Sequence, residues 1–256
     1  MKVCISEFPD DAARQAAAWD ALTGHVAATQ PELVVLPEMP FCQWIFVGDT
    51  VEPVRWSDAV DRHDRMIERL GELGAPWVVS SRPVDYAGRR FNEAYLWSAA
   101  IGYQPLRRKW YLPDAPRAKE TVWFDQGDRD FRLVPCRQLR FGVQMCSEMM
   151  FPEHSRALGL AGAHLVVQPR ATAPGNKWNV ASEMGAVSSG CYVISANRRS
   201  YARDWFCGNS WLLSPEAEIL AETTAEQPFV TADIDLALAE KSKSTYPRDL
   251  QRMYVA

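Results

Sequence analysis

Residues 139–152 have the sequence LRFGVQMCSEMMFP, in which an apolar run ends at a cysteine and a proline follows. An apolar run bounded by turn signals is typical of a strand, so we expect a strand over residues 139–145. Pro152 suits the first turn of a helix, where its missing N–H would have no intrahelical partner. The segment therefore predicts a strand, a sharp turn that carries Cys146, and a helix.

The same order of strand and helix recurs along the chain. Helices are expected over residues 10–29, 57–73 and 177–189. Strands are expected over residues 2–8, 33–36, 77–80, 94–97, 164–168 and 192–195, with short ones over 210–214, 218–222 and 228–233. Strands that alternate with helices predict an α/β layered fold. No repeat or linker-like run interrupts the pattern, so residues 1–256 are expected to form a single domain.

The composition favours a small-molecule partner. The formal net charge of -4 provides no basic field for nucleic acid or for a membrane surface. Residues 1–7 lack the apolar core of a secretory signal, and no stretch approaches the ~20 apolar residues that span a bilayer. The six cysteines form no CxxC pair and the four histidines no cluster, which predicts reduced thiols in a cytoplasmic protein without a metal or cofactor.

Three apolar runs end in a reactive side chain: Glu38, Lys109 and Cys146. Ligand sites in α/β folds gather at the carboxyl ends of strands, so these residues are expected to converge. A helix N-terminus after Cys146 would lower the pKa of its thiol from ~8.5. Each residue also has a purely structural explanation. Glu38 could end a strand in water, Lys109 could belong to a charged edge strand, and Cys146 could be a buried structural thiol.

The residues around these three side chains resemble the signature blocks of the nitrilase-like carbon–nitrogen hydrolases. The blocks are Leu36-Pro37-Glu38, RKWYLP at 108–113 and CSEMMFPE at 146–153, and GNSWLLSP at 208–215 resembles a late strand of the family. The order of the blocks agrees with the family, and 71 residues separate Glu38 from Lys109. The resemblance covers nearly the whole chain and implies an αββα sandwich that pairs into a dimer or a larger homo-oligomer.

The resemblance also implies a mechanism. Cys146 would attack a small amide to form a thioester, with Glu38 as the general base. Lys109 and the backbone N–H of Ser147 would stabilise the oxyanion. Glu120 resembles a fourth family residue that positions the substrate and Lys109.

The substrate-binding residues follow from the same resemblance. Ser147-Glu148 replaces the Trp-Glu that usually follows the nucleophile of true nitrilases, which favours an amide or ureido substrate over a nitrile. Arg170 is expected either to clamp a substrate carboxylate or to pair with Glu148 or Glu153. The remaining residues expected to line an aromatic pocket are Trp44, Tyr111 and Trp178.

Other functions remain open at this point. The same thioester would serve an acyltransferase, which passes the acyl group to an amine instead of water. A nitrilase and a non-catalytic binding protein on the same fold are the remaining alternatives.

Overall fold

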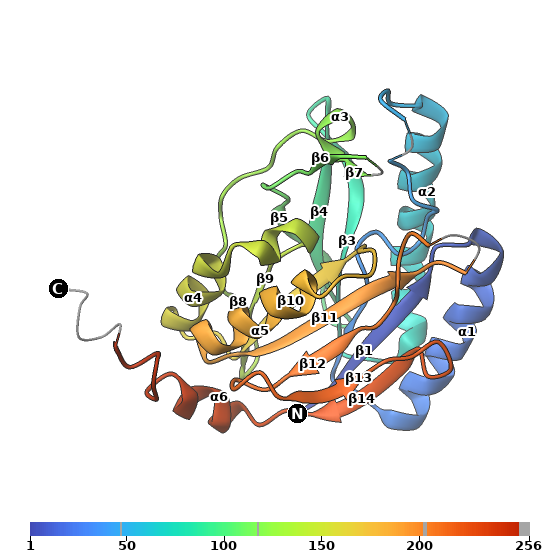
Figure 1. Cartoon of the computed structure of the whole chain (residues 1–256). Helices are drawn as coiled ribbons and strands as arrows, with labels where there is room; N and C mark the ends of the chain where they lie inside the picture. The colour runs from blue at the N-terminus through green and yellow to red at the C-terminus, as the bar shows by residue number, and fades with distance from the viewer. Residues whose placement is uncertain (47, 117, 202–203, 251–256) are drawn as a thin grey trace.

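The computed structural model describes residues 1–250 except 47, 117, 202 and 203. Two β-sheets lie face to face, and helices cover their outer faces (Figure 1). The first sheet has the order β5-β4-β3-β2-β1-β14, and the second contains β8-β9-β10-β11 with β12 and β13 beyond β11. Parallel pairing of β1 with β11 joins the two sheets at one end. The α/β expectation and the αββα sandwich are confirmed.

The bounds of the elements are as follows. The first sheet contains β1 (Lys2–Pro9), β2 (Leu33–Val35), β3 (Trp77–Tyr86), β4 (Arg89–Ser98), β5 (Gly102–Arg108) and β14 (Phe229–Asp233). The second contains β8 (Val134–Cys136), β9 (Leu139–Val143), β10 (Leu165–Arg170), β11 (Tyr192–Arg199), β12 (Trp211–Leu213) and β13 (Ile219–Glu222). The helices are α1 (Ala12–Thr29), α2 (Pro53–Arg69), α3 (Glu120–Trp123), α4 (Pro152–Leu160), α5 (Lys177–Ser189) and α6 (Leu236–Ser242), and the hairpin strands are β6 (Asp114–Ala115) and β7 (Ala118–Lys119).

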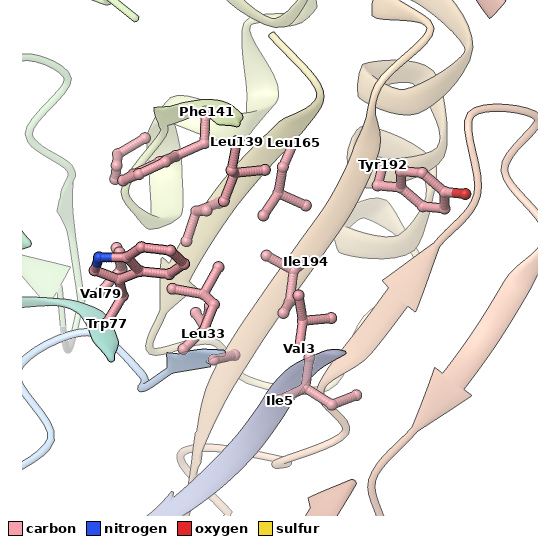
Figure 2. Packing of buried hydrophobic residues seen from close by; sticks show 14 of the residues in the cluster. Val3, Ile5, Leu33, Trp77, Val79, Leu139, Phe141, Leu165, Tyr192 and Ile194 are labelled. Atoms are coloured by element: carbon pink, nitrogen blue, oxygen red, sulfur yellow. The ribbon is translucent and has the colours of Figure 1, made fainter. Parts of the chain in front are cut away.

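The central strands are apolar on both faces because each face is covered. On β2, Leu33 and Val35 pack between the two sheets, whereas Val34 packs against α1 and α2. Figure 2 shows the inter-sheet core, where Leu33 faces Leu165 and Ile194 of the second sheet. Full burial of one such side chain contributes about 1.5–3 kcal/mol. Alternate side chains of β2 therefore stabilise two different contacts, one between the two sheets and one between the first sheet and its helices.

Most of the expected elements are present with shifted ends. The helix expected at 57–73 begins at Pro53, because proline suits the first helical position, and its last turn is a 3-10 helix that ends at Leu73. The sequence pattern does not predict β5, β8, the β6–β7 hairpin, α3 or α6. No helix in the described part of the chain is long and apolar enough to cross a membrane.

The direction of the strands brings three loops together. In the first sheet, β2 runs parallel to β1 and to β3. In the second, β9, β10 and β11 run parallel to one another, and β11 also runs parallel to β1. β5 shares the direction of β3, because both pair antiparallel with β4. The carboxyl ends of β2, β5 and β9 therefore lie at one edge of the sandwich, and they carry Glu38, Lys109 and Cys146.

Candidate active site

Lys109 joins two carboxylates at this edge. Its Nζ donates hydrogen bonds to Glu38 Oε1 and to Glu120 Oε1, both at 2.8 Å. Glu38 Oε1 also accepts a hydrogen bond from Asn92 Nδ2 at 2.8 Å. Glu38 is 0% exposed, and Lys109 and Glu120 are each 1% exposed. The charges of all three act on the Cys146 thiol. The structure thus brings together the four residues expected to be catalytic.

Cys146 lies on a strained turn between β9 and α4. Its φ of 46° falls in the left-handed region, which is unfavourable for a residue with a side chain. Met145 N donates to Glu148 Oε2 at 2.8 Å, and Ser147 Oγ donates to Tyr111 O at 2.5 Å, so both neighbours of the cysteine are held in place. Strain of this kind persists only where surrounding contacts enforce it, and these two hydrogen bonds are such contacts.

The Cys146 thiol is protonated at rest. Burial raises its pKa, the nearby Glu38 carboxylate raises it further, and the ammonium of Lys109 opposes them. The expectation of a lowered pKa is wrong because burial and the Glu38 charge outweigh the Lys109 ammonium. A 3-10 turn over Cys146–Met150 follows the β9 strand, and α4 begins only at Pro152. A base must therefore take the proton before the sulfur can attack a substrate.

For both Lys109 and Glu120, burial and the charge of the oppositely charged neighbour shift the pKa in opposite directions. Burial lowers the pKa of Lys109, but the carboxylates of Glu120 and Glu38 outweigh it and keep the ammonium charged. Burial together with the Glu38 charge raises the pKa of Glu120 to about 8, although Lys109 opposes the rise. Glu38 Oε2 and Glu120 Oε2 are buried and accept no hydrogen bond from the described residues.

Glu120 should therefore make the stability of the fold pH-dependent. Between its ordinary pKa of 4.5 and about 8, the folded chain holds a proton that the unfolded chain has released. The free energy of unfolding should fall as pH rises through this window, by up to about 1.4 kcal/mol per pH unit. Urea unfolding of wild type and Glu120→Gln across the window measures this contribution. Stability curves that run parallel in the two proteins would contradict it.

The buried groups border a cavity of about 440 Å³. Residues near the reactive sulfur that line it are Cys146, Ser147, Glu120, Ala171 and Thr172. The aromatic side chains that line it are Trp44, Trp178, Trp205 and Phe206, and its charged lining also includes Lys177 and Asp204. Of the expected substrate-binding residues, Ser147, Trp44 and Trp178 therefore border the cavity. In the described part of the chain, no group of His, Cys, Asp and Glu side chains is arranged to hold a metal ion.

Tyr111 and Glu148 support the site from behind the cavity lining. The Tyr111 ring stacks on Phe151 at 3.8 Å, and its hydroxyl lies 2.9 Å from His154 Nε2. Glu148 is buried and forms an ion pair with Arg107, whose Nη2 donates to Oε1 at 3.0 Å. Glu148 also accepts from the backbone N–H groups of Trp110 and Met145, both at 2.8 Å. One carboxylate thus ties the chain after Lys109 to the chain before Cys146.

Replacement of Glu148 by glutamine should destabilise the protein by about 3–5 kcal/mol, because it leaves the Arg107 charge buried without a counter-ion. Urea unfolding measures the change in free energy. The double variant Glu148→Gln/Arg107→Met should lose less than the sum of the two single changes, since it removes both charges. A single-variant loss below about 1 kcal/mol would show that solvent reaches the pair.

Arg170 does not face the active-site cavity. Its guanidinium is fully buried over the Trp211 ring at 3.9 Å, and Nε donates to Ser195 Oγ at 2.7 Å. The other nitrogens donate to Thr172 Oγ1 and Asn209 O. The expected pairing with Glu148 or Glu153 is wrong, since Arg107 takes Glu148. Burial lowers the pKa of Arg170 to about 10.

Sequence reasoning missed Asn92 and the role of Arg198. Arg198 is fully buried and donates to the backbone carbonyls of Glu38, Met39 and Cys42. Its Nη2 also donates to Asp10 Oδ1 at 2.6 Å, and the same oxygen accepts Trp44 N at 2.9 Å. Arg198 therefore fixes the loop that carries both Glu38 and Trp44. Its position three residues after the strand expected at 192–195 was the available signal.

Comparison with known proteins places the chain among enzymes that act on C–N bonds. A family model described as carbon-nitrogen hydrolase matches residues 5–244. A nitrilase of Pyrococcus abyssi is 30% identical over 131 residues, which are 49% of this chain and 48% of the nitrilase. An omega-amidase of Xenopus tropicalis is 25% identical over 205 residues, which are 75% of this chain and 72% of the omega-amidase. The chain thus matches about half the length of some curated relatives.

Solved structures agree on the fold. A carbon-nitrogen hydrolase from Helicobacter pylori G27 has a TM-score of 0.84 at 20% identity, covering 98% of this chain and 95% of that one. A variant of the amidase from Nesterenkonia sp. AN1 has a TM-score of 0.73 at 19% identity, covering 100% of both chains. That structure shows the result of Michael addition of acrylamide at the active-site cysteine of the amidase.

Proposed function

The chain belongs to the carbon–nitrogen hydrolase family, and on that premise we propose that it hydrolyses a small amide through Cys146, Glu38 and Lys109. One observation carries the proposal: a buried ammonium joins two carboxylates beside a thiol held on a strained turn. A structural role alone would not require a positive φ at a cysteine that borders a cavity. The combination supplies a nucleophile, a base and a positive charge in one place.

We assign the role of general base to Glu38. Its Oε1 accepts hydrogen bonds from Lys109 and Asn92, and its Oε2, which has no partner in the described part of the chain, is open to accept a proton. Glu120 is engaged by Lys109 Nζ, which donates to its Oε1 at 2.8 Å, and burial raises the pKa of Glu120. Glu120 therefore orients Lys109 through Oε1 and leaves proton transfer to Glu38.

The first half of the reaction forms a thioester. Glu38 takes the thiol proton as the Cys146 sulfur attacks the amide carbon, and the carbonyl oxygen becomes negative. The Lys109 ammonium and the Ser147 backbone N–H stabilise that charge, and loss of one such donor typically costs about 3 kcal/mol of barrier. The C–N bond then breaks, and the leaving nitrogen takes the proton from Glu38 to depart as ammonia or an amine.

The second half uses water. Glu38 removes a proton from a water molecule that attacks the thioester carbon, and Lys109 again faces the negative oxygen. The C–S bond breaks, the carboxylic acid leaves, and the proton returns to the sulfur. An acyltransferase would share these steps with an amine in place of water.

The cavity supports an amide or ureido substrate of modest size. Its aromatic lining, which includes Trp44, Trp178 and Phe206, suits an apolar group next to the carbonyl. Two further expectations stay proposals. A homo-oligomer is supported by exposed Val180 and Met184, four residues apart on one face of α5. A cytoplasmic location is supported by the six free cysteines.

The proposal is tested by incubating the protein with amides, N-carbamoyl compounds and nitriles of graded size. Ammonia release and the intact mass of the protein are followed together. Release from amides with a transient acyl adduct of matching mass would support the proposal, and release from nitriles alone would assign a nitrilase. A panel without turnover or adduct would favour a binding protein. Transfer of the acyl group to an added amine, faster than hydrolysis, would assign an acyltransferase.

A further inference from the structure

A second cavity, of about 130 Å³, is lined by residues of α4, α5 and α6 and of the segment after α6, and it shares no lining residue with the cavity beside Cys146. Figure 1 shows where these three helices lie. At roughly 30 Å³ for each water molecule, it has room for about four waters or one small ion. Its charged and hydroxyl lining comes from Arg156 on α4, Ser188 and Ser189 at the end of α5, Glu240 on α6, and Lys243 and Arg248 after α6. Three of these side chains are cationic and one is anionic.

Lys243 is a buried ammonium that forms no ion pair with the residues that the structure describes. It is only 9% exposed, and Nζ donates one hydrogen bond, to Ala239 O at 2.8 Å. Nζ forms no ion pair with any carboxylate of the described residues, so two of its three donors are unused. Burial lowers the pKa of Lys243, which shows that the nearby Glu240 does not compensate for the lost hydration. A buried charge without a partner is unfavourable, so a structure that retains one commonly uses it to bind a ligand.

Glu240, the carboxylate in the cavity lining, acts on Lys243 through its charge but forms no ion pair with it in the described part of the chain. Glu240 is engaged by Arg140 and by His164 Nε2, which lies 2.7 Å from its Oε1. Arg248 forms an ion pair with Glu216 and donates to three further oxygens, which leaves one of its five N–H donors unused.

The two serines add no donors, because the hydroxyls of Ser188 and Ser189 both donate to Gly185 O. The unused hydrogen-bond donors at the cavity therefore belong to two cationic side chains, Lys243 and Arg248.

From the Lys243 ammonium, which forms no ion pair with the described residues, and the spare Arg248 donor at the same small cavity, we propose that this junction binds a small oxyanion of the phosphate type. The ion accepts hydrogen bonds from Lys243 and Arg248 and joins the three helices. The site is separate from the proposed amidase chemistry, because none of these residues lines the cavity beside Cys146. α5 connects the two cavities, since Lys177 and Trp178 at its start border the first one.

Thermal unfolding in phosphate and in sodium chloride of equal ionic strength tests the proposal. With phosphate at about a hundredfold excess over its dissociation constant, the Tm of the wild type should rise by about 5 °C relative to chloride. Lys243→Met should abolish most of this rise. The same variant should melt no lower than wild type in chloride, because methionine removes the unpaired charge while keeping the length of the side chain.

Lys241→Met is the matched control, since Lys241 is an exposed lysine two residues earlier. It should keep the full phosphate response. A wild type that responds equally to phosphate and chloride, or a Lys243→Met protein that keeps the response, would overturn the proposal. If Lys243→Met fails to fold, calorimetric titration of the wild type with phosphate decides alone: saturable heat at one ion per chain supports the site, and its absence rejects it.

Discussion

Replacement of Cys146 by alanine is expected to lower kcat for amide hydrolysis by about 10⁴-fold or more, because no other group at the site can form the thioester. The fold should persist, since the hydrogen bonds that hold the turn come from the backbone of Met145 and the side chain of Ser147. Ammonia release under single-turnover conditions measures the loss. Circular dichroism of the same sample shows whether the protein is folded.

Acrylamide provides an independent readout that does not require the true substrate. As a Michael acceptor it should add once to the wild type, and the adduct should be absent from Cys146→Ala. Cys136→Ala is the control, because Cys136 lies on β8 in the inter-sheet core and does not line the cavity beside Cys146. Labelling of Cys146→Ala at the wild-type rate, or ammonia release that survives in it, would remove Cys146 from the mechanism.

The positions of the reactive residues could be predicted because they depend on strand ends. Glu38 and Cys146 each follow a short apolar run, and in a sheet with these parallel pairings such ends share one edge. Lys109 was placed by its spacing and its resemblance to a family block, although β5 itself was not predicted. That strand is only partly buried, so its apolar pattern is weak.

The failed expectations concern partners that are distant in the sequence. Arg170 bonds to Ser195 and Asn209, which lie 25 and 39 residues away, and nothing near Arg170 in the sequence indicates them. Asn92 lies 54 residues from the carboxylate it positions. The direction of the Cys146 pKa shift was missed because it depends on burial and on the charges of distant residues, which the sequence around Cys146 does not show.

Replacement of the buried Lys109 is expected to have the second large effect, on both catalysis and stability. Lys109→Met should lower kcat by about 10³-fold, because the oxyanion loses the ammonium that lies beside the Cys146 thiol. It should also lower the free energy of unfolding by about 3–5 kcal/mol, since Glu38 is then a buried carboxylate without a counter-ion. Ammonia release measures the first effect, and urea unfolding at neutral pH measures the second.

The two effects separate in a double variant. Lys109→Met/Glu38→Gln removes both charges, so its stability loss should be smaller than the sum of the single losses, while its activity should stay low. Lys119→Met is the control, because Lys119 pairs with exposed Asp114 in water and its loss should change stability by less than about 1 kcal/mol. Additive stability losses would mean that the ammonium and the Glu38 carboxylate do not interact in the folded protein. Catalysis would then require another source of positive charge at the oxyanion.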